Sequence, residues 1–336
     1  MRANFATGCY IIDSKPMASR ILGIHHVTAI SGPAQENLDF YTEVLGLRLV
    51  KLTVNFDDPN AYHLYYGDSA GTPGSILTFF PYPSGYPGRP GSGQATVTSL
   101  AVPPGSLGYW TERFKKNEVD FDRISNRGGV QAVPFRAPDG LQLELVAAPD
   151  YKLTAKREGS AVPADYQVAN VRSVTLTVRE LAPTEAVLME LLGFQKLDHR
   201  DNRHRYEIKG EASSRIVEVV VDAEGPVGRQ GHGGVHHVAF RTATEDEQLE
   251  FREEILRRGF HVSPVTNRDY FKSIYFREPG GILFEIATDA PGFAIDEPVE
   301  ALGSSLQLPK QFADLRGQIE RALPKLVLPS SLRSRS

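Results

Sequence analysis

Residues 23–30 of this 336-residue chain read Gly-Ile-His-His-Val-Thr-Ala-Ile, and residues 234–240 read Gly-Val-His-His-Val-Ala-Phe. Each segment is a short run of apolar and β-branched residues, which is typical of a buried β-strand. A buried strand rarely contains two adjacent histidines, and this chain has two such strands. The repeated pair therefore predicts that the two strands come together around one chemical site.

The sequence around these strands repeats one structural unit four times. In the first unit a strand (about 21–30) precedes an amphipathic helix that ends at Gly46, and strands follow at 47–54, 62–66 and 75–80. Similar units begin near residues 96, 171 and 234. We therefore predict an α+β fold of four βαβββ modules, paired into two cupped, barrel-like halves with a cavity inside.

The predicted domain organisation follows the order of the units. We expect a disordered extension at 1–19, modules 1 and 2 at 20–148, a polar linker at 149–168 and modules 3 and 4 at 169–290. A C-terminal segment at 291–336 contains a helix at about 310–322, on which Leu315 and Ile319 lie one turn apart and are expected to dock on the body. Met17 lies just before the first predicted strand, and we interpret it as a candidate start of the protein.

Composition excludes several classes of protein. Lys plus Arg is 37 and Asp plus Glu is 41, and the chain has neither an extended basic run nor an apolar run that could span a bilayer. We expect no nucleic-acid or membrane partner. The single cysteine, Cys9, precludes an internal disulfide and a cysteine-based zinc site, and it fits a cytoplasmic protein.

Three side chains are candidate metal ligands. Neighbouring residues in a strand point to opposite faces, so we expect one imidazole from each histidine pair to face the cavity, although parity alone does not say which. Glu285 lies in the apolar strand 281–287, where an unpaired charge would cost several kcal/mol to bury. Two imidazoles and one carboxylate on one side of a metal are the ligand set of non-haem Fe(II) oxygenases.

The other units indicate one metal cavity with three protein ligands. Glu144 occupies the place of Glu285 in the second unit, but units two and three begin without histidine, so we expect Glu144 to be structural and units one and four to build the cavity. Aligning 73–79 with 279–285 puts Phe79 opposite Glu285. A glyoxalase-type isomerase would have a second glutamate there, and its absence leaves room for a substrate and O₂. His63 is a further candidate for the cavity wall.

The segments HHVT (25–28), NFDDP (55–59), YHLYYGD (62–68), GTPG (71–74) and VHHVAF (235–240) together resemble the vicinal oxygen chelate superfamily, and more closely its ring-cleaving dioxygenases that act on hydroquinones. The resemblance extends from about residue 21 to 326. It implies that His26, His237 and Glu285 bind Fe(II), with Mn(II) or Zn(II) as alternatives. It also implies catalytic roles for His25, Thr28, His236, Arg268 and Tyr275.

The expected activity is ring cleavage of a hydroquinone or catechol-like diol with O₂, so the expected partners are a small aromatic substrate and O₂. A homo-oligomer is compatible with the sequence. Two alternatives are a Zn-, Ni- or Mn-dependent lyase or isomerase of the glyoxalase type and a protein that sequesters a small aromatic compound.

Overall fold

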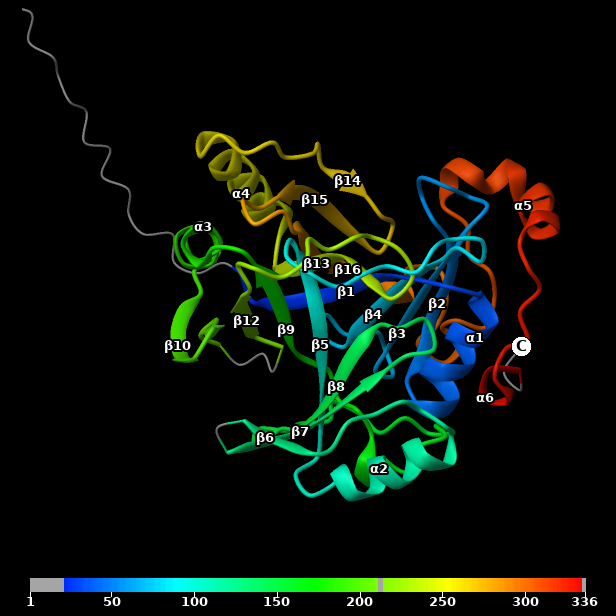
Figure 1. The fold of residues 1–336 in the computed structure, drawn as a ribbon. Helices are drawn as coiled ribbons and strands as arrows, with labels where there is room; N and C mark the ends of the chain where they lie inside the picture. The colour runs from blue at the N-terminus through cyan, green and yellow to red at the C-terminus, as the bar shows by residue number, and fades with distance from the viewer. Residues whose placement is uncertain (1–20, 128, 211–213, 334–336) are drawn as a thin grey trace, which may run out of the picture.

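The computed structural model describes residues 21–127, 129–210 and 214–333, and it arranges them as two curled eight-stranded sheets (Figure 1). The predicted extension at 1–19 and Met17 lie outside these residues. Figure 1 shows helices α1, α2, α3 and α4 on the outside of the sheets. The predicted α+β architecture of cupped halves is therefore confirmed.

The first sheet combines the first and last units, in the order β14-β15-β16-β13-β1-β4-β3-β2. Its strands are β1 (Gly23–Ser31), β2 (Arg48–Val54), β3 (Tyr62–Gly67), β4 (Ile76–Pro81), β13 (Gly234–Thr242), β14 (Thr266–Asn267), β15 (Phe271–Arg277) and β16 (Leu283–Pro291). The histidine strands β1 and β13 pair with each other at its centre. The chain thus closes on itself, as the two histidine pairs predicted.

The second sheet contains the middle units, in the order β10-β11-β12-β9-β5-β8-β7-β6. Its strands are β5 (Gln94–Val102), β6 (Ser125–Arg127), β7 (Val130–Arg136), β8 (Gln142–Ala147), β9 (Val171–Val178), β10 (Gln195–Arg200), β11 (Arg203–Glu207) and β12 (Ile216–Val221).

The helices differ in detail from the predicted ones. They are α1 (Ala34–Asp39), α2 (Leu107–Lys116), α3 (Leu181–Ala186), α4 (Glu245–Arg257), α5 (Arg316–Ala322) and α6 (Ser330–Arg333). In units one and three the predicted helix divides into a short α-helix and a π-helical turn, Phe40–Val44 and Val187–Leu191. The first of these ends before Gly46, whose φ of 67° suits a glycine.

The C-terminal helix docks through one of its two predicted residues. Ile319 on α5 is buried, whereas Leu315 is 38% exposed. The helix is also shorter than predicted, because residues Lys310–Leu315 form a 3₁₀ turn. The 3₁₀ turn has a different angular period from an α-helix, so Leu315 does not lie on the face that Ile319 presents.

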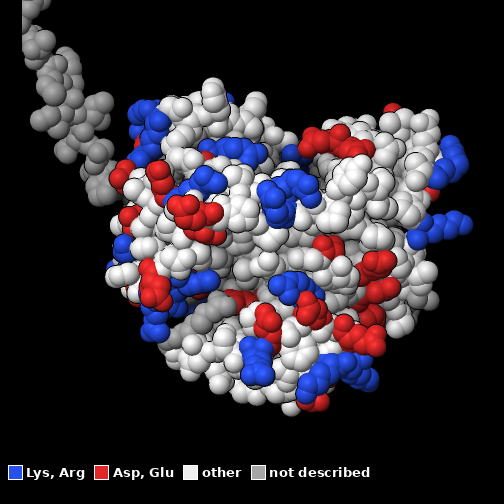
Figure 2. All heavy atoms as spheres, in the orientation of Figure 1, with Lys and Arg blue, Asp and Glu red and all other residues white. Residues whose placement is uncertain are grey.

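A buried lysine attaches the segment that follows β16 to the first sheet. Lys51 on β2 is fully buried, and its Nζ lies 2.5 Å from Asp296 Oδ1 and 2.5 Å from Glu297 Oε2. On the face seen in Figure 2, by contrast, acidic and basic side chains are interspersed at the surface.

Replacing Lys51 by Met should therefore destabilise the protein by about 3 kcal/mol, because Glu297 would remain buried without a cation. The exposed pair Lys115–Glu112 provides the control, and Lys115→Met should cost less than about 1 kcal/mol. Chemical denaturation measured by circular dichroism compares the two variants. Equal losses would show that the buried triad does not anchor the segment.

Candidate metal centre

The structure brings His26, His237 and Glu285 together at the centre of the first sheet. His26 Nε2 lies 3.2 Å from His237 Nε2, and Glu285 Oε2 lies 2.9 Å from His237 Nε2 and 3.4 Å from His26 Nε2. All three side chains are buried. Among the described residues this is the one group of three or more potential ligands whose donor atoms converge in this way.

The spacing of these atoms fits a bound divalent metal. Two donor atoms at right angles on one ion, each with a bond of about 2.1 Å, lie about 3.0 Å apart, and the observed separations are close to that value. Burial opposes ionisation of Glu285, but the neighbouring His26 and His237 hold the pKa of its carboxyl well below the usual range. The site is therefore a buried carboxylate beside two imidazoles, a donor set that suits Fe(II) or Zn(II).

Two β-bulges place the paired histidines, and the parity prediction is wrong for the second pair: His236 and His237 both line the cavity beside the site, whereas His26 lines it without His25. Ile24 pairs with Phe240 and His26 with Ala239, so His25 is an extra residue in β1; likewise His236 is an extra residue in β13. A bulge interrupts the alternation of side chains. The two rings of each pair consequently meet, with Nδ1–Nδ1 distances of 2.9 Å for His25–His26 and 2.8 Å for His236–His237.

These contacts suit one tautomer of each candidate ligand. A histidine that binds a metal through Nε2 carries its proton on Nδ1, so with a metal bound His26 and His237 would donate to the Nδ1 atoms of His25 and His236. Burial, followed by the charge on the neighbouring histidine, lowers the pKa of His25 well below its usual value and that of His236 to about 3. Both rings are therefore neutral.

A cavity of about 310 Å³ opens beside the three candidate ligands. Its wall contains His236, Arg268 and Tyr275 from the last unit, as well as His63 from the first. Arg268 lies in the turn between β14 and β15, and its Nε donates to Tyr275 Oη at 3.2 Å. Sequence reasoning gave no site role to the other lining residues, which are Ile30, Asn55, Phe56, Asp57, Tyr65, Phe80, Tyr82 and Phe271.

The last-unit wall is rich in hydrogen-bond donors. Burial, followed by the charge of Glu285, raises the pKa of Tyr275, so its phenol stays protonated. Since Arg268 donates to Tyr275, the Tyr275 O–H is left to donate elsewhere. With a metal on His237 Nε2, His236 would accept at Nδ1 and carry its own proton on Nε2. Such donors stabilise negative charge that develops on a bound oxygen.

Thr28 and Ser273 lie behind the cavity wall. Thr28 Oγ1 is 2.8 Å from Thr78 Oγ1, and Thr28 is not among the residues that line the cavity. Ser273 Oγ donates to Glu285 Oε1 at 2.5 Å. Sequence reasoning missed Ser273, although its place two residues before Tyr275 puts both on one face of β15.

The strand register also corrects the residue opposite Glu285. Glu285 pairs with Ala239, two residues after His237, and Thr78 pairs with Thr28, two residues after His26. Thr78 therefore occupies the position that Phe79 was predicted to occupy. Phe79 points the other way, and its ring packs against Tyr41, with 4.4 Å between centroids. Since Thr78 has no carboxylate either, the described residues offer three ligands at this site.

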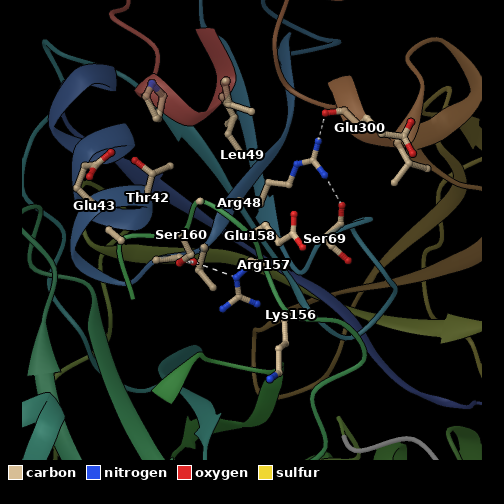
Figure 3. Close-up of a pocket in the computed structure, with 17 residues that line it drawn as sticks. Thr42, Glu43, Arg48, Leu49, Ser69, Lys156, Arg157, Glu158, Ser160 and Glu300 are labelled. Carbon is tan, nitrogen blue, oxygen red and sulfur yellow. Dashed lines mark hydrogen bonds between the residues drawn. The ribbon is translucent and has the colours of Figure 1, made fainter. Parts of the chain in front are cut away.

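A second cavity, of about 220 Å³, lies between the first helix, the linker and the C-terminal segment (Figure 3). Arg157 of the linker donates from Nε to the Gly46 carbonyl at 2.9 Å, and Arg48 donates to the Ser69 carbonyl at 2.6 Å. No histidine is found among the described residues that line it. These contacts attach the linker and neighbouring segments to the first unit, whereas the candidate ligands His26 and His237 line the other cavity.

Comparisons with known proteins identify the family of this chain. Residues 23–145 and 170–286 match the model of the Glyoxalase/Bleomycin resistance protein/Dioxygenase superfamily, and the chain belongs to this family. It is 43% identical over 309 residues to "Putative ring-cleaving dioxygenase MhqO" of Bacillus subtilis, covering 91% of this chain and 97% of the relative. It is 31% identical over 313 residues to "Chlorohydroquinone/hydroquinone 1,2-dioxygenase" of Sphingobium indicum, covering 91% and 97%.

Solved structures support the fold. A Bacillus subtilis protein named "putative dioxygenase" superposes with a TM-score of 0.89 at 41% identity, covering 93% of this chain and 99% of that one. Glyoxalase I from Zea mays superposes with a TM-score of 0.60 at 15% identity, covering 80% and 92%, which is evidence for the fold alone.

Proposed function

We propose that this protein is a non-haem Fe(II)-dependent, extradiol-type ring-cleaving dioxygenase that acts on a hydroquinone or catechol-like aromatic diol with O₂. The observation that supports it most is the convergence of His26, His237 and Glu285 beside a cavity whose wall supplies hydrogen-bond donors. The names of the relatives, ring-cleaving and hydroquinone dioxygenases, point the same way.

In this proposal His26, His237 and Glu285 would hold Fe(II), which when bound would supply Lewis acidity and a path for electrons from the diol to O₂. His25 and His236 keep the two ligand rings in the correct tautomer. The Tyr275 O–H and the His236 Nε2–H donate to oxygen atoms of the substrate, and the Arg268 guanidinium stabilises negative charge on them. Phe80 and Phe271 give the cavity apolar surface for an aromatic ring.

The test is metal analysis of protein purified without oxygen, followed by oxygen consumption with a panel of substituted hydroquinones and catechols. We expect about one iron per chain, as three ligands can hold it, and diol-dependent oxygen uptake. Full activity with Zn or Ni and no oxygen uptake would instead assign a glyoxalase-type lyase or isomerase. Protein that takes up no metal would assign a binding protein.

Arg268 should be a catalytic residue in this reaction. Arg268→Gln should lower kcat/KM by about a hundredfold, the usual cost of removing a group that stabilises developing charge. Asp57→Asn is the control: Asp57 Oδ2 lies 3.4 Å from Arg268 Nη1, but the aspartate side chain is 79% exposed. An exposed pair contributes little, so this change should alter kcat/KM by less than about fivefold. Equal effects of the two variants would contradict the role given to Arg268.

A further inference from the structure

His63 and Tyr65 are two polar cavity-wall residues to which the proposed reaction assigns no role. Both lie on β3, in the first unit, and both are buried. The Tyr65 hydroxyl is 2.9 Å from His63 Nδ1, and His63 Nε2 is 2.8 Å from Thr78 Oγ1. Thr78 in turn contacts Thr28. The four side chains form one continuous hydrogen-bonded chain that begins at the cavity.

Because of the internal repeat, the hydrogen-bonded residues of the first unit correspond to residues of the last unit on the opposite wall of the cavity. Tyr65 pairs with Thr78 in the same way as Tyr275 pairs with Glu285. Two residues earlier on each strand, His63 contacts Thr78 and Ser273 contacts Glu285. The last unit thus presents a candidate metal ligand, whereas the first presents a hydrogen-bonding group at the equivalent place.

The side chains of this hydrogen-bonded chain are neutral, and the direction of donation along it can reverse. Burial lowers the pKa of His63 and raises the pKa of Tyr65, so neither side chain is charged near neutral pH. The Tyr65 hydroxyl can donate to His63 and accept from a ligand, or accept from His63 and donate to a ligand, since hydroxyl groups rotate to suit their partners. A neutral group of this kind matches a hydroxyl better than it matches a charged group.

Aromatic rings line the cavity beside the His63–Tyr65 hydrogen bonds and beside the candidate metal ligands. The Phe80 ring lies 4.4 Å from the His63 ring and 5.6 Å from the His236 ring, and the Phe271 ring lies 5.2 Å from the His26 ring, all between centroids. Such surroundings suit a flat ring with polar groups at its edges.

We propose that Tyr65 and His63 form a subsite for the second hydroxyl of an aromatic diol whose first oxygen lies beside His26, His237 and Glu285. This inference rests on the proposed function for the identity of the ligand as a diol. It makes Tyr65 and His63 residues that select diols over monophenols.

The test is binding of hydroquinone and of phenol, measured by calorimetry without oxygen on the metal-loaded protein. Wild-type protein should bind hydroquinone about tenfold more tightly than phenol, as one additional neutral hydrogen bond would give. Tyr65→Phe should bring the two affinities within about twofold, and His63→Gln should reduce the difference. Tyr66→Phe is the matched control, because the Tyr66 hydroxyl is bonded to Asn37 Oδ1 in the core.

A wild-type protein without a preference for hydroquinone, or a Tyr65→Phe variant that keeps the preference, would overturn the proposal. Metal content and melting temperature verify that each variant folds. This experiment and the test of the proposed function can fail independently. Absence of oxygen uptake with every diol contradicts the dioxygenase activity, whereas the ratio of the two affinities tests the subsite alone.

Discussion

Glu285→Gln should leave the purified protein almost free of iron and abolish diol-dependent oxygen consumption. Glu285 is the single carboxylate among the three converging side chains, and its Oε2 faces both imidazoles. An amide has no negative charge to offer a divalent cation. Loss of a ligand should weaken metal binding by at least about a hundredfold, the upper end of the effect of removing a group that only supports a ligand.

The second half of the molecule provides a matched control for this substitution. Glu144 is buried at the corresponding place, pairs with Ser99 in the parallel register, and accepts a hydrogen bond from Ser99 Oγ at 2.6 Å. Glu144→Gln should therefore leave the iron content at the wild-type level. Metal analysis and oxygen electrode measurements compare the two variants. If Glu285→Gln retained as much iron as Glu144→Gln, the assignment of the metal site would be wrong.

Thr78→Glu should convert the three-ligand site into a four-ligand site. Thr78 lies on β4 beside Thr28, in the position that Glu285 occupies on β16 beside Ala239. A carboxylate there should retain the metal at least as well as the wild-type protein does. It should also occupy a position that substrate or O₂ requires, so oxygen consumption should fall by at least about a hundredfold.

Thr78→Gln separates the effect of the new ligand from the effect of size. Both replacements enlarge a fully buried residue, which costs about 1–3 kcal/mol of stability. The glutamine variant should show no gain in metal affinity over the wild type, since its side chain is neutral. Isothermal titration with Mn(II) and oxygen consumption with Fe(II) provide the two measurements. Wild-type oxygen consumption by Thr78→Glu would show that Thr78 does not lie at the open coordination position.

The fourfold repeat was predictable because it rests on local patterns. Alternation of apolar residues marks the strands, helical spacing marks the helices, and glycines such as Gly46 mark where helices end. The two histidine pairs also indicated that the first and last units meet. Histidine is costly to bury unless something binds it, so two such strands in separate units had a common explanation.

Side-chain direction near the site was less predictable, because it depends on pairing between distant strands. A bulge at His25 and another at His236 interrupt strict alternation, and nothing in either strand alone indicates where they fall. For the same reason, the sequence alignment wrongly placed Phe79, rather than Thr78, at the position equivalent to Glu285. A shift of one residue in register exchanges the two faces of a strand, and loop length does not determine it.

The sequence by itself determined the modular fold, the closure of the first unit on the last, and a possible ligand set of Glu285 and one histidine from each pair. These follow from residue types and their local periodicity, which the chain carries whatever its surroundings. Only the tertiary structure decided that Ser273 supports Glu285, that Thr78 fills the equivalent position, and that His63 and Tyr65 share the cavity with Arg268 and Tyr275. Those relations depend on the register between strands far apart in the chain, and packing of the whole sheet sets that register.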